Sequence, residues 1–102
     1  MKYLVTLTSK AGIDDAKIKT FAVPTMQTLW GLYIRDIVRE MYVREDKKGM
    51  VLIMEAPSAQ ALAEALSAIP WVNQDLVQGE GIRLTPLRDI ALAFVAENQE
   101  AA

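Results

Sequence analysis

Residues 50–54, Met-Val-Leu-Ile-Met, constrain the fold of this chain more than any other segment because they are apolar at every position. In a β-strand, successive side chains point to opposite faces, so Leu52 and the two methionines face one side while Val51 and Ile53 face the other. A strand that is apolar on both faces is normally buried on both faces. We therefore expect helices against one face of a sheet and another protein layer against the opposite face.

The patterns around this segment predict the order β-α-β-β-α-β, followed by a C-terminal helix. This order is the ferredoxin-like arrangement, in which two helices cover one face of a four-stranded antiparallel sheet. We expect one α+β domain over residues 1–97 and a frayed tail over residues 98–102. The expected strands lie within residues 2–8, 37–46, 49–56 and 76–85, and the expected helices within residues 15–35 and 58–69, with an amphipathic segment around Ile90.

Two prolines divide the helical patterns. Pro24 interrupts the first pattern, which predicts either a kink or a new helix with Pro24 in its first turn. Ser58 is expected to cap the second helix, and Pro70 to end it. Trp71 follows in a connection, where polar turn residues would be typical. We interpret Trp71 as a cap over the end of a sheet shared with another chain, with the wall of a ligand pocket as the alternative.

Composition excludes several classes of function. The chain has no Cys and no His, which removes disulfides, the usual zinc sites, thiol chemistry and every His-dependent relay, so we predict no metal and no cofactor. Every charge between Gly49 and Gly81 is acidic, so a basic nucleic-acid surface is not expected. The apolar runs are too short for a membrane span or a signal peptide. A cytoplasmic protein is the resulting prediction.

The uncovered side of the expected sheet predicts self-association. Each large apolar side chain left in water forfeits about 1.5–3 kcal/mol, and a chain of 102 residues has no third layer to cover Val51 and Ile53. A second copy, packed sheet against sheet, provides the cover. We therefore predict a homodimer or a higher homo-oligomer.

Candidate catalytic groups lie on two neighbouring strands. Glu40, Tyr42 and Arg44 alternate onto one face of the second expected strand, and Glu55 shares a face of the third with Ile53. Burial between two sheets raises the pKa of a carboxyl group, which could then take up and return a proton. The alternative is a set of cross-strand ion pairs at a sheet rim, each contributing little. The sequence leaves open which face of the second strand points inward.

The segment Gly79–Gly81, Gly-Glu-Gly, is not a phosphate-binding loop. It lacks a third glycine and the strand-before, helix-after context of such loops. Glycines within a strand more often mark a bulge or a close approach of another backbone.

The chain resembles the family of small proteins related to muconolactone delta-isomerase. The resemblance runs from Pro24 through Trp30 to REMYVREDKKGMVLIMEAPSAQALAEALSAIPWV and IRLTPL, about residues 20–90. It implies ferredoxin-like subunits that pair through their sheets into a dimeric α+β barrel. Its more specific elements are Pro70 and the motif R-x-x-Y-x-R-x-D, formed by Arg39, Tyr42, Arg44 and Asp46.

The chain departs from the family pattern at two turns and one strand. Family members often have glycine where Asp36 and Asp75 stand, although aspartate is among the few residues that tolerate left-handed backbone geometry. The segment between Leu76 and Leu84 is longer than the pattern.

The resemblance implies an isomerase that moves a double bond in a small unsaturated lactone during the catabolism of aromatic compounds. Glu55 or Glu40 would be the base and Tyr42 the donor to the enolate oxygen. Two alternatives stay open: a cofactor-free monooxygenase acting on an aromatic or polyketide, and a non-catalytic barrel that binds a small apolar or aromatic acid or serves in assembly. The expected substrate-binding residues are Arg44, Arg39 and Trp71.

Overall fold

A computed structural model describes residues 1–87 of the chain. These residues follow the expected β-α-β-β-α-β order, but the first expected helix is divided into two, and a short additional helix follows the second. The expected C-terminal helix around Ile90 and the expected fraying of residues 98–102 lie outside the described residues. The elements are β1 (Lys2–Ser9), α1 (Asp15–Thr20), α2 (Ala22–Ile34), β2 (Val38–Val43), β3 (Gly49–Glu55), α3 (Ala59–Ser67), α4 (Pro70–Asn73) and β4 (Val77–Leu84).

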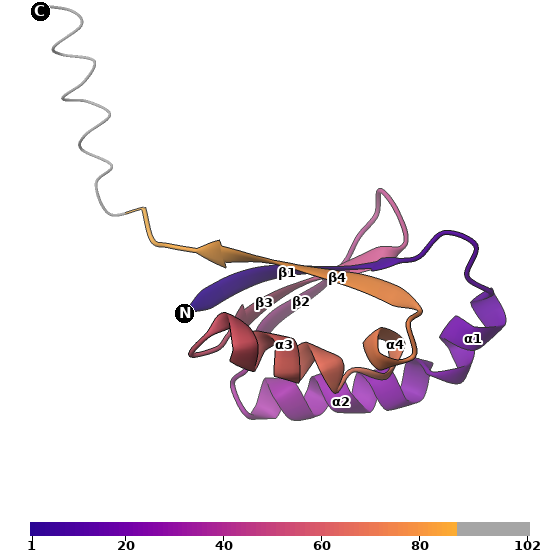
Figure 1. Ribbon diagram of the computed structural model, residues 1–102, viewed down its shortest axis with the longest axis horizontal. Helices are drawn as coiled ribbons and strands as arrows, with labels where there is room; N and C mark the ends of the chain where they lie inside the picture. The colour runs from indigo at the N-terminus through magenta and orange to yellow at the C-terminus, as the bar shows by residue number, and fades with distance from the viewer. Residues whose placement is uncertain (88–102) are drawn as a thin grey trace, which may run out of the picture.

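The four strands form one antiparallel sheet in the order β2-β3-β1-β4. Figure 1 shows α1 to α4 on the same side of this sheet, so the described part of the chain has two layers. The fold therefore has the expected ferredoxin-like α+β architecture. Within residues 1–87, no helix covers the opposite side of the sheet.

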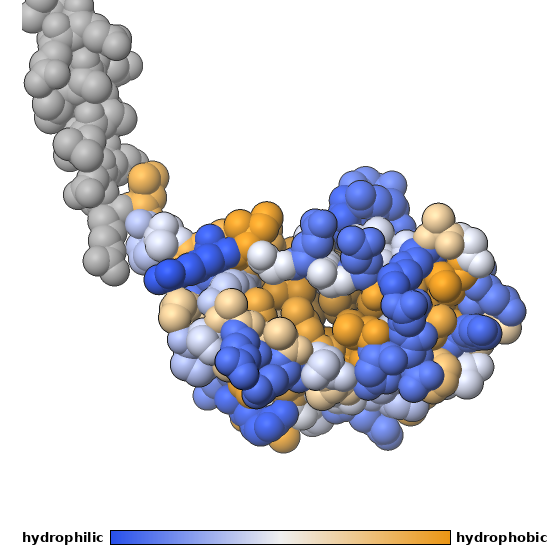
Figure 2. Space-filling model, in the orientation of Figure 1, coloured by the Kyte–Doolittle hydropathy of each residue, from blue (hydrophilic) through white to orange (hydrophobic). Residues whose placement is uncertain are grey.

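The core lies between the sheet and the helix layer. Alternate residues of the strands point to this side, and the apolar stripes of α2 and α3 meet them. In Figure 2, hydrophobic side chains are visible between the sheet and the helices, where the core reaches the surface. The largest fully buried side chains are Leu7, Leu29, Leu32, Leu52, Met54, Ile69, Val5, Val38 and Thr25.

Side-chain caps and prolines fix where the helices begin. The Asp14 carboxylate accepts a hydrogen bond from the Ala16 backbone at 3.0 Å, and the Ser58 hydroxyl accepts one from the Ala61 backbone at 3.1 Å. The first helical pattern breaks at Phe21, and Pro24 lies in the first turn of α2. The structure thus confirms the break that Pro24 predicts.

The segment after α3 differs from the sequence prediction. α3 ends at Ser67, and Pro70 occupies the first helical position of the short helix α4. Proline is favoured there because its missing N–H needs no partner at a helix start, while Ile69 before it stays extended. Trp71 therefore lies in a helical turn and not, as the sequence suggested, in an irregular connection.

The glycines of β4 allow α3 to approach the sheet closely. Gly79 and Gly81 point to the helix side, since they pair with the buried residues Leu7 and Val5 of β1. A Cβ atom on Gly81 would lie 3.0 Å from Leu62 Cδ2, which is closer than nearly all real contacts. At these glycines leucine side chains come close, and not the bulge or second backbone that the sequence suggested.

Candidate functional site

The side of the sheet that no helix covers within residues 1–87, called here the open face, has an apolar centre. Leu4 lies at its middle, directly between Ile53 of β3 and Ile82 of β4. Ile82 is 57% exposed, although isoleucine is a typical core residue. The open face therefore offers an apolar surface of the kind that binds a small molecule or another protein layer.

A β-bulge in β2 determines which of its side chains border this apolar centre. Val38 pairs with Met54, but the next pair joins Glu40 to Ile53, so Arg39 is the extra residue. As a result Glu40 and Tyr42 both point to the open face. This settles the alternation that the sequence left open.

Glu40 and Tyr42 interact directly on the open face. The Tyr42 hydroxyl donates a hydrogen bond to Glu40 Oε1 at 2.5 Å. This hydrogen bond, together with the negative charge of Glu40, raises the pKa of Tyr42 above its ordinary value. The phenol therefore stays protonated at neutral pH, where it is a hydrogen-bond donor beside a carboxylate.

Arg44 lies at the hairpin end of the same face but is already paired. Its Nε is 3.0 Å from Asp46 Oδ1 and its Nη2 is 2.7 Å from Asp46 Oδ2, a bidentate ion pair. The hydrogen bonds that Arg44 donates to the Asp46 carboxylate raise the pKa of Arg44 and lower the pKa of Asp46. The ion pair between Arg44 and Asp46 thus stabilises the hairpin loop. A substrate carboxylate could bind Arg44 only by displacing Asp46.

Glu55 lies at the other end of the open face, where β3 ends. Its Oε2 is 3.3 Å from the α-amino nitrogen of Met1, and it pairs across the sheet with Lys2. Lys2 and Arg83, which the sequence analysis did not single out, join Glu55 around a depression of about 700 Å³. Strand register brings these residues together, and no local motif signals it.

Two of the predicted site residues lie away from these groups. Arg39 sits in the β2 bulge, where its Nε donates to the Asp36 carbonyl at 2.9 Å. Trp71 lies in the helix layer, and its indole N–H donates to the Ile18 carbonyl at 2.9 Å. The structure therefore brings Glu40 and Tyr42 together, keeps Arg44 and Glu55 at opposite ends of the same face, and separates Arg39 and Trp71 from them.

Residues 1–87 contain no cluster of three or more Asp or Glu side chains suited to holding a metal ion. No helix among them is both long and apolar enough to cross a membrane.

No protein-family model and no curated protein matches this sequence. Solved structures do match. One is muconolactone isomerase, with 18% identity over 87% of this chain and 93% of that one, and a TM-score of 0.72. Another is 5-chloro-2-hydroxyhydroquinone dehydrochlorinase from Burkholderia phenoliruptrix in complex with 2,5-dihydroxybenzoquinone. It has 19% identity over 83% of this chain and 94% of that one, and a TM-score of 0.67. At these identities the likeness establishes the fold, and at that level it confirms the resemblance to the muconolactone isomerase-like family.

Proposed function

We propose that this chain binds a small unsaturated lactone, or a related carboxylic acid, on its open face and isomerises it by proton transfer. The observation that carries the proposal is the 2.5 Å hydrogen bond from Tyr42 to Glu40 at the edge of an apolar surface. It supports the proposal because a carboxylate, which can act as a base, and a protonated phenol lie close enough together to contact one small molecule. The proposed substrate class is an analogy from muconolactone isomerase, whose fold this chain shares.

The reaction needs only the transfer of one proton. The Glu40 carboxylate removes a proton from the γ-carbon of an α,β-unsaturated lactone, and the C–H electron pair moves into a dienolate. Tyr42 turns its O–H to the dienolate oxygen and stabilises the negative charge there. Glu40 then returns the proton to the carbon next to the lactone carbonyl, which shifts the double bond and regenerates the carboxylate.

Enclosure by a second copy is part of the proposal. Tyr42 is 54% exposed and Ile82 57% exposed in the single chain, so neither is shielded from water. Two open faces packed together would cover both residues and exclude water from the bound ligand, which strengthens every electrostatic interaction inside. We therefore propose a homodimer that pairs through its sheets, with Glu40 and Tyr42 in the space between them.

The proposal is tested by incubating the protein with muconolactone in D₂O and following the product by NMR. Turnover is expected, with deuterium at the carbon next to the lactone carbonyl to the extent that the proton held by Glu40 exchanges with solvent before its return. Glu40→Gln should lower kcat by about 10²–10⁴-fold, since a positioned acid-base group contributes that much, and Tyr42→Phe by about 10²–10³-fold. Glu80→Gln is the control, because Glu80 lies on the open face of β4 and should leave kcat unchanged.

Three outcomes would contradict this assignment. Full activity in Glu40→Gln with loss in Glu55→Gln would move the base to the other end of the face. Full activity in the variant that combines Glu40→Gln with Glu55→Gln would exclude both glutamates as the base. Oxygen uptake without isomerisation would favour the cofactor-free monooxygenase.

A further inference from the structure

The outward side of α2 carries an apolar stripe, called here the α2 stripe: Val23, Met26, Trp30, Tyr33 and Ile34. Helix α2 contains no charged residue along its 13 residues. Surface helices of soluble domains normally place charged and polar residues on the side away from the core. Here Val23 is 66% exposed, Trp30 59% and Ile34 63%. The stripe is thus a second unpartnered surface in the described part of the chain.

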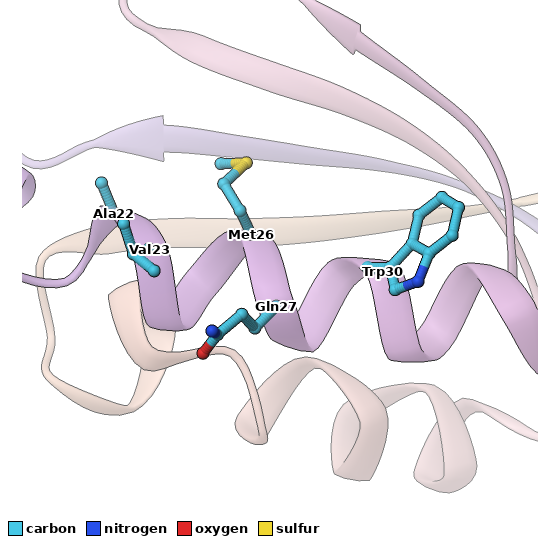
Figure 3. A pocket seen from close by; sticks show the side chains of 5 residues that line it. All are labelled: Ala22, Val23, Met26, Gln27 and Trp30. Atoms are coloured by element: carbon cyan, nitrogen blue, oxygen red, sulfur yellow. The ribbon is translucent and has the colours of Figure 1, made fainter.

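The two aromatic residues of the stripe, Trp30 and Tyr33, are already stacked on each other in the single chain. The rings of Trp30 and Tyr33 stack with centroids 5.5 Å apart and planes 24° from parallel. Figure 3 shows Met26 and Trp30 projecting from the same side of the helix, along a shallow apolar hollow that Val23 also lines. Rigid Trp and Tyr side chains lose little conformational entropy on binding and dominate the energy of many protein interfaces.

Gly31 provides an independent indication of close contact. A glycine inside a helix costs about 1 kcal/mol relative to alanine, and Gly31 does not need a positive φ. A Cβ atom on Gly31 would meet nothing within 4 Å, so no packing inside residues 1–87 requires its absence. The close approach of a helix from outside the chain supplies the missing reason, because only glycine leaves room for another backbone at that point.

We propose that α2 of a second copy of this chain packs on the α2 stripe about a two-fold axis near Gly31. The stripe suits its own copy, since it carries no charge to repel itself and offers the Trp30 projection together with the hollow that Val23 and Met26 line. Its five side chains expose on the order of 500 Å² per chain. Two copies would bury about 1,000 Å², the lower limit for a specific interface.

This contact does not rest on the proposed function. Figure 1 shows α2 in the helix layer, on the opposite side of the sheet from the open face. Both contacts can therefore form at once. Used together, they would link sheet-paired dimers into assemblies larger than a dimer.

Cross-linking tests whether a second copy of the chain packs on the α2 stripe. The chain has no cysteine, so a single introduced thiol reports one position. Gln27→Cys lies exposed on the outward side of α2, one turn from Gly31, and leaves Gly31 in place, so a short bis-maleimide should join most of it into covalent dimers. The control, Gln60→Cys, lies exposed on α3 and should remain mostly unlinked. Equal cross-linking of the two variants, or none in Gln27→Cys, would overturn the proposal.

The mass of the assembly, measured by light scattering, separates this proposal from the sheet-paired dimer. The wild type should exceed a dimer. Trp30→Glu should reduce it to a sheet-paired dimer, and Ile82→Glu on the open face to a dimer held by α2, with circular dichroism confirming that both variants fold. A wild-type dimer that Trp30→Glu makes monomeric supports the α2 contact and contradicts sheet pairing. A wild-type mass that Trp30→Glu does not change overturns the α2 contact.

Discussion

The hydroxyl of Thr25 accepts a hydrogen bond from the backbone N–H of Trp71 at 3.2 Å, across 46 positions in the sequence. Thr25 is fully buried in α2, and Trp71 belongs to α4. The Trp71 indole also donates to the Ile18 carbonyl of α1. Trp71 of the short helix α4 thus bonds to both α1 and α2, the two helices that replace the first predicted helix. The helix layer owes part of its cohesion to two polar contacts as well as to apolar packing.

We expect Thr25→Val to lower the free energy of unfolding by about 1–3 kcal/mol, because it leaves the Trp71 N–H without a partner in a partly buried position. Urea denaturation followed by tryptophan fluorescence measures this change. Thr28→Val is the matched control, since the Thr28 hydroxyl accepts nothing from another element and donates only to the Pro24 carbonyl of its own helix. Equal losses in the two variants would assign the effect to the hydroxyl in general and not to the tie to α4.

The titration of Tyr42 should depend on Glu40. The hydrogen bond to Glu40 and its charge raise the pKa of Tyr42, so Tyr42 should ionise at higher pH than an ordinary tyrosine, for which the pKa is about 10. Its contribution to stability is then present below about pH 10 and lost as pH rises through the folded-state pKa. Ultraviolet absorbance, as the difference from Tyr42→Phe, follows this ionisation. Glu40→Gln should bring the pKa of Tyr42 back toward its usual value; an unchanged titration would show that the pair does not form in solution.

A methyl group on Gly81 should strain the contact between α3 and the sheet. We expect Gly81→Ala to lower the free energy of unfolding by about 1–3 kcal/mol, since the added Cβ would lie 3.0 Å from Leu62 Cδ2. Thermal or urea denaturation measures the loss. Gln78→Ala, which changes an exposed residue on the opposite face of the same strand, should stay within about 0.5 kcal/mol of the wild type. A smaller loss from Gly81→Ala in a Leu62→Ala background than in the wild-type background would identify the crowded contact.

The turn between α2 and β2 should accept glycine better than valine. Asp36 has φ of 61°, a left-handed conformation that glycine adopts freely and a β-branched residue adopts at high cost. Asp36→Gly should therefore leave the free energy of unfolding unchanged or raise it by up to about 1 kcal/mol, whereas Asp36→Val should lower it by at least that amount.

Asp75 provides the comparison, since it has φ of 62° but also accepts a hydrogen bond from Lys10. Asp75→Gly gains the same backbone freedom and loses this contact, so it should be less favourable than Asp36→Gly. Equal effects at the two positions would show that the Lys10 contact adds nothing to stability.

The sequence predicts the features of this fold that depend on local chemistry. Alternation along residues 50–54 indicates a strand with two apolar faces, Pro24 indicates a broken helix, and Ser58 indicates a helix start. Each signal acts within a few residues, through side-chain direction or backbone restriction. Those predictions match the structure.

Features that depend on strand register could not be predicted in the same way. The bulge at Arg39 has no sequence signature, because neither a glycine nor a proline marks it, and it becomes visible only when β2 is aligned with β3. The proximity of Lys2 to Glu55 likewise follows from the pairing of β1 with β3. The sequence does predict that Glu40 and Tyr42 lie on one face, since they are two positions apart in a strand. It does not predict the hydrogen bond between them.

The bulge at Arg39 decides on which side of the sheet the polar pair lies. Val38 and Glu40 are two positions apart, yet they pair with the consecutive residues Met54 and Ile53 and so point to opposite faces. If β2 paired regularly with Arg39 still in the strand, either Val38 would turn outward or Glu40 and Tyr42 would turn toward the helices, because one residue of slip reverses every side chain that follows. Deletion of Arg39 would instead restore regular pairing and leave both orientations as they are, since neighbouring residues of a strand alternate between faces.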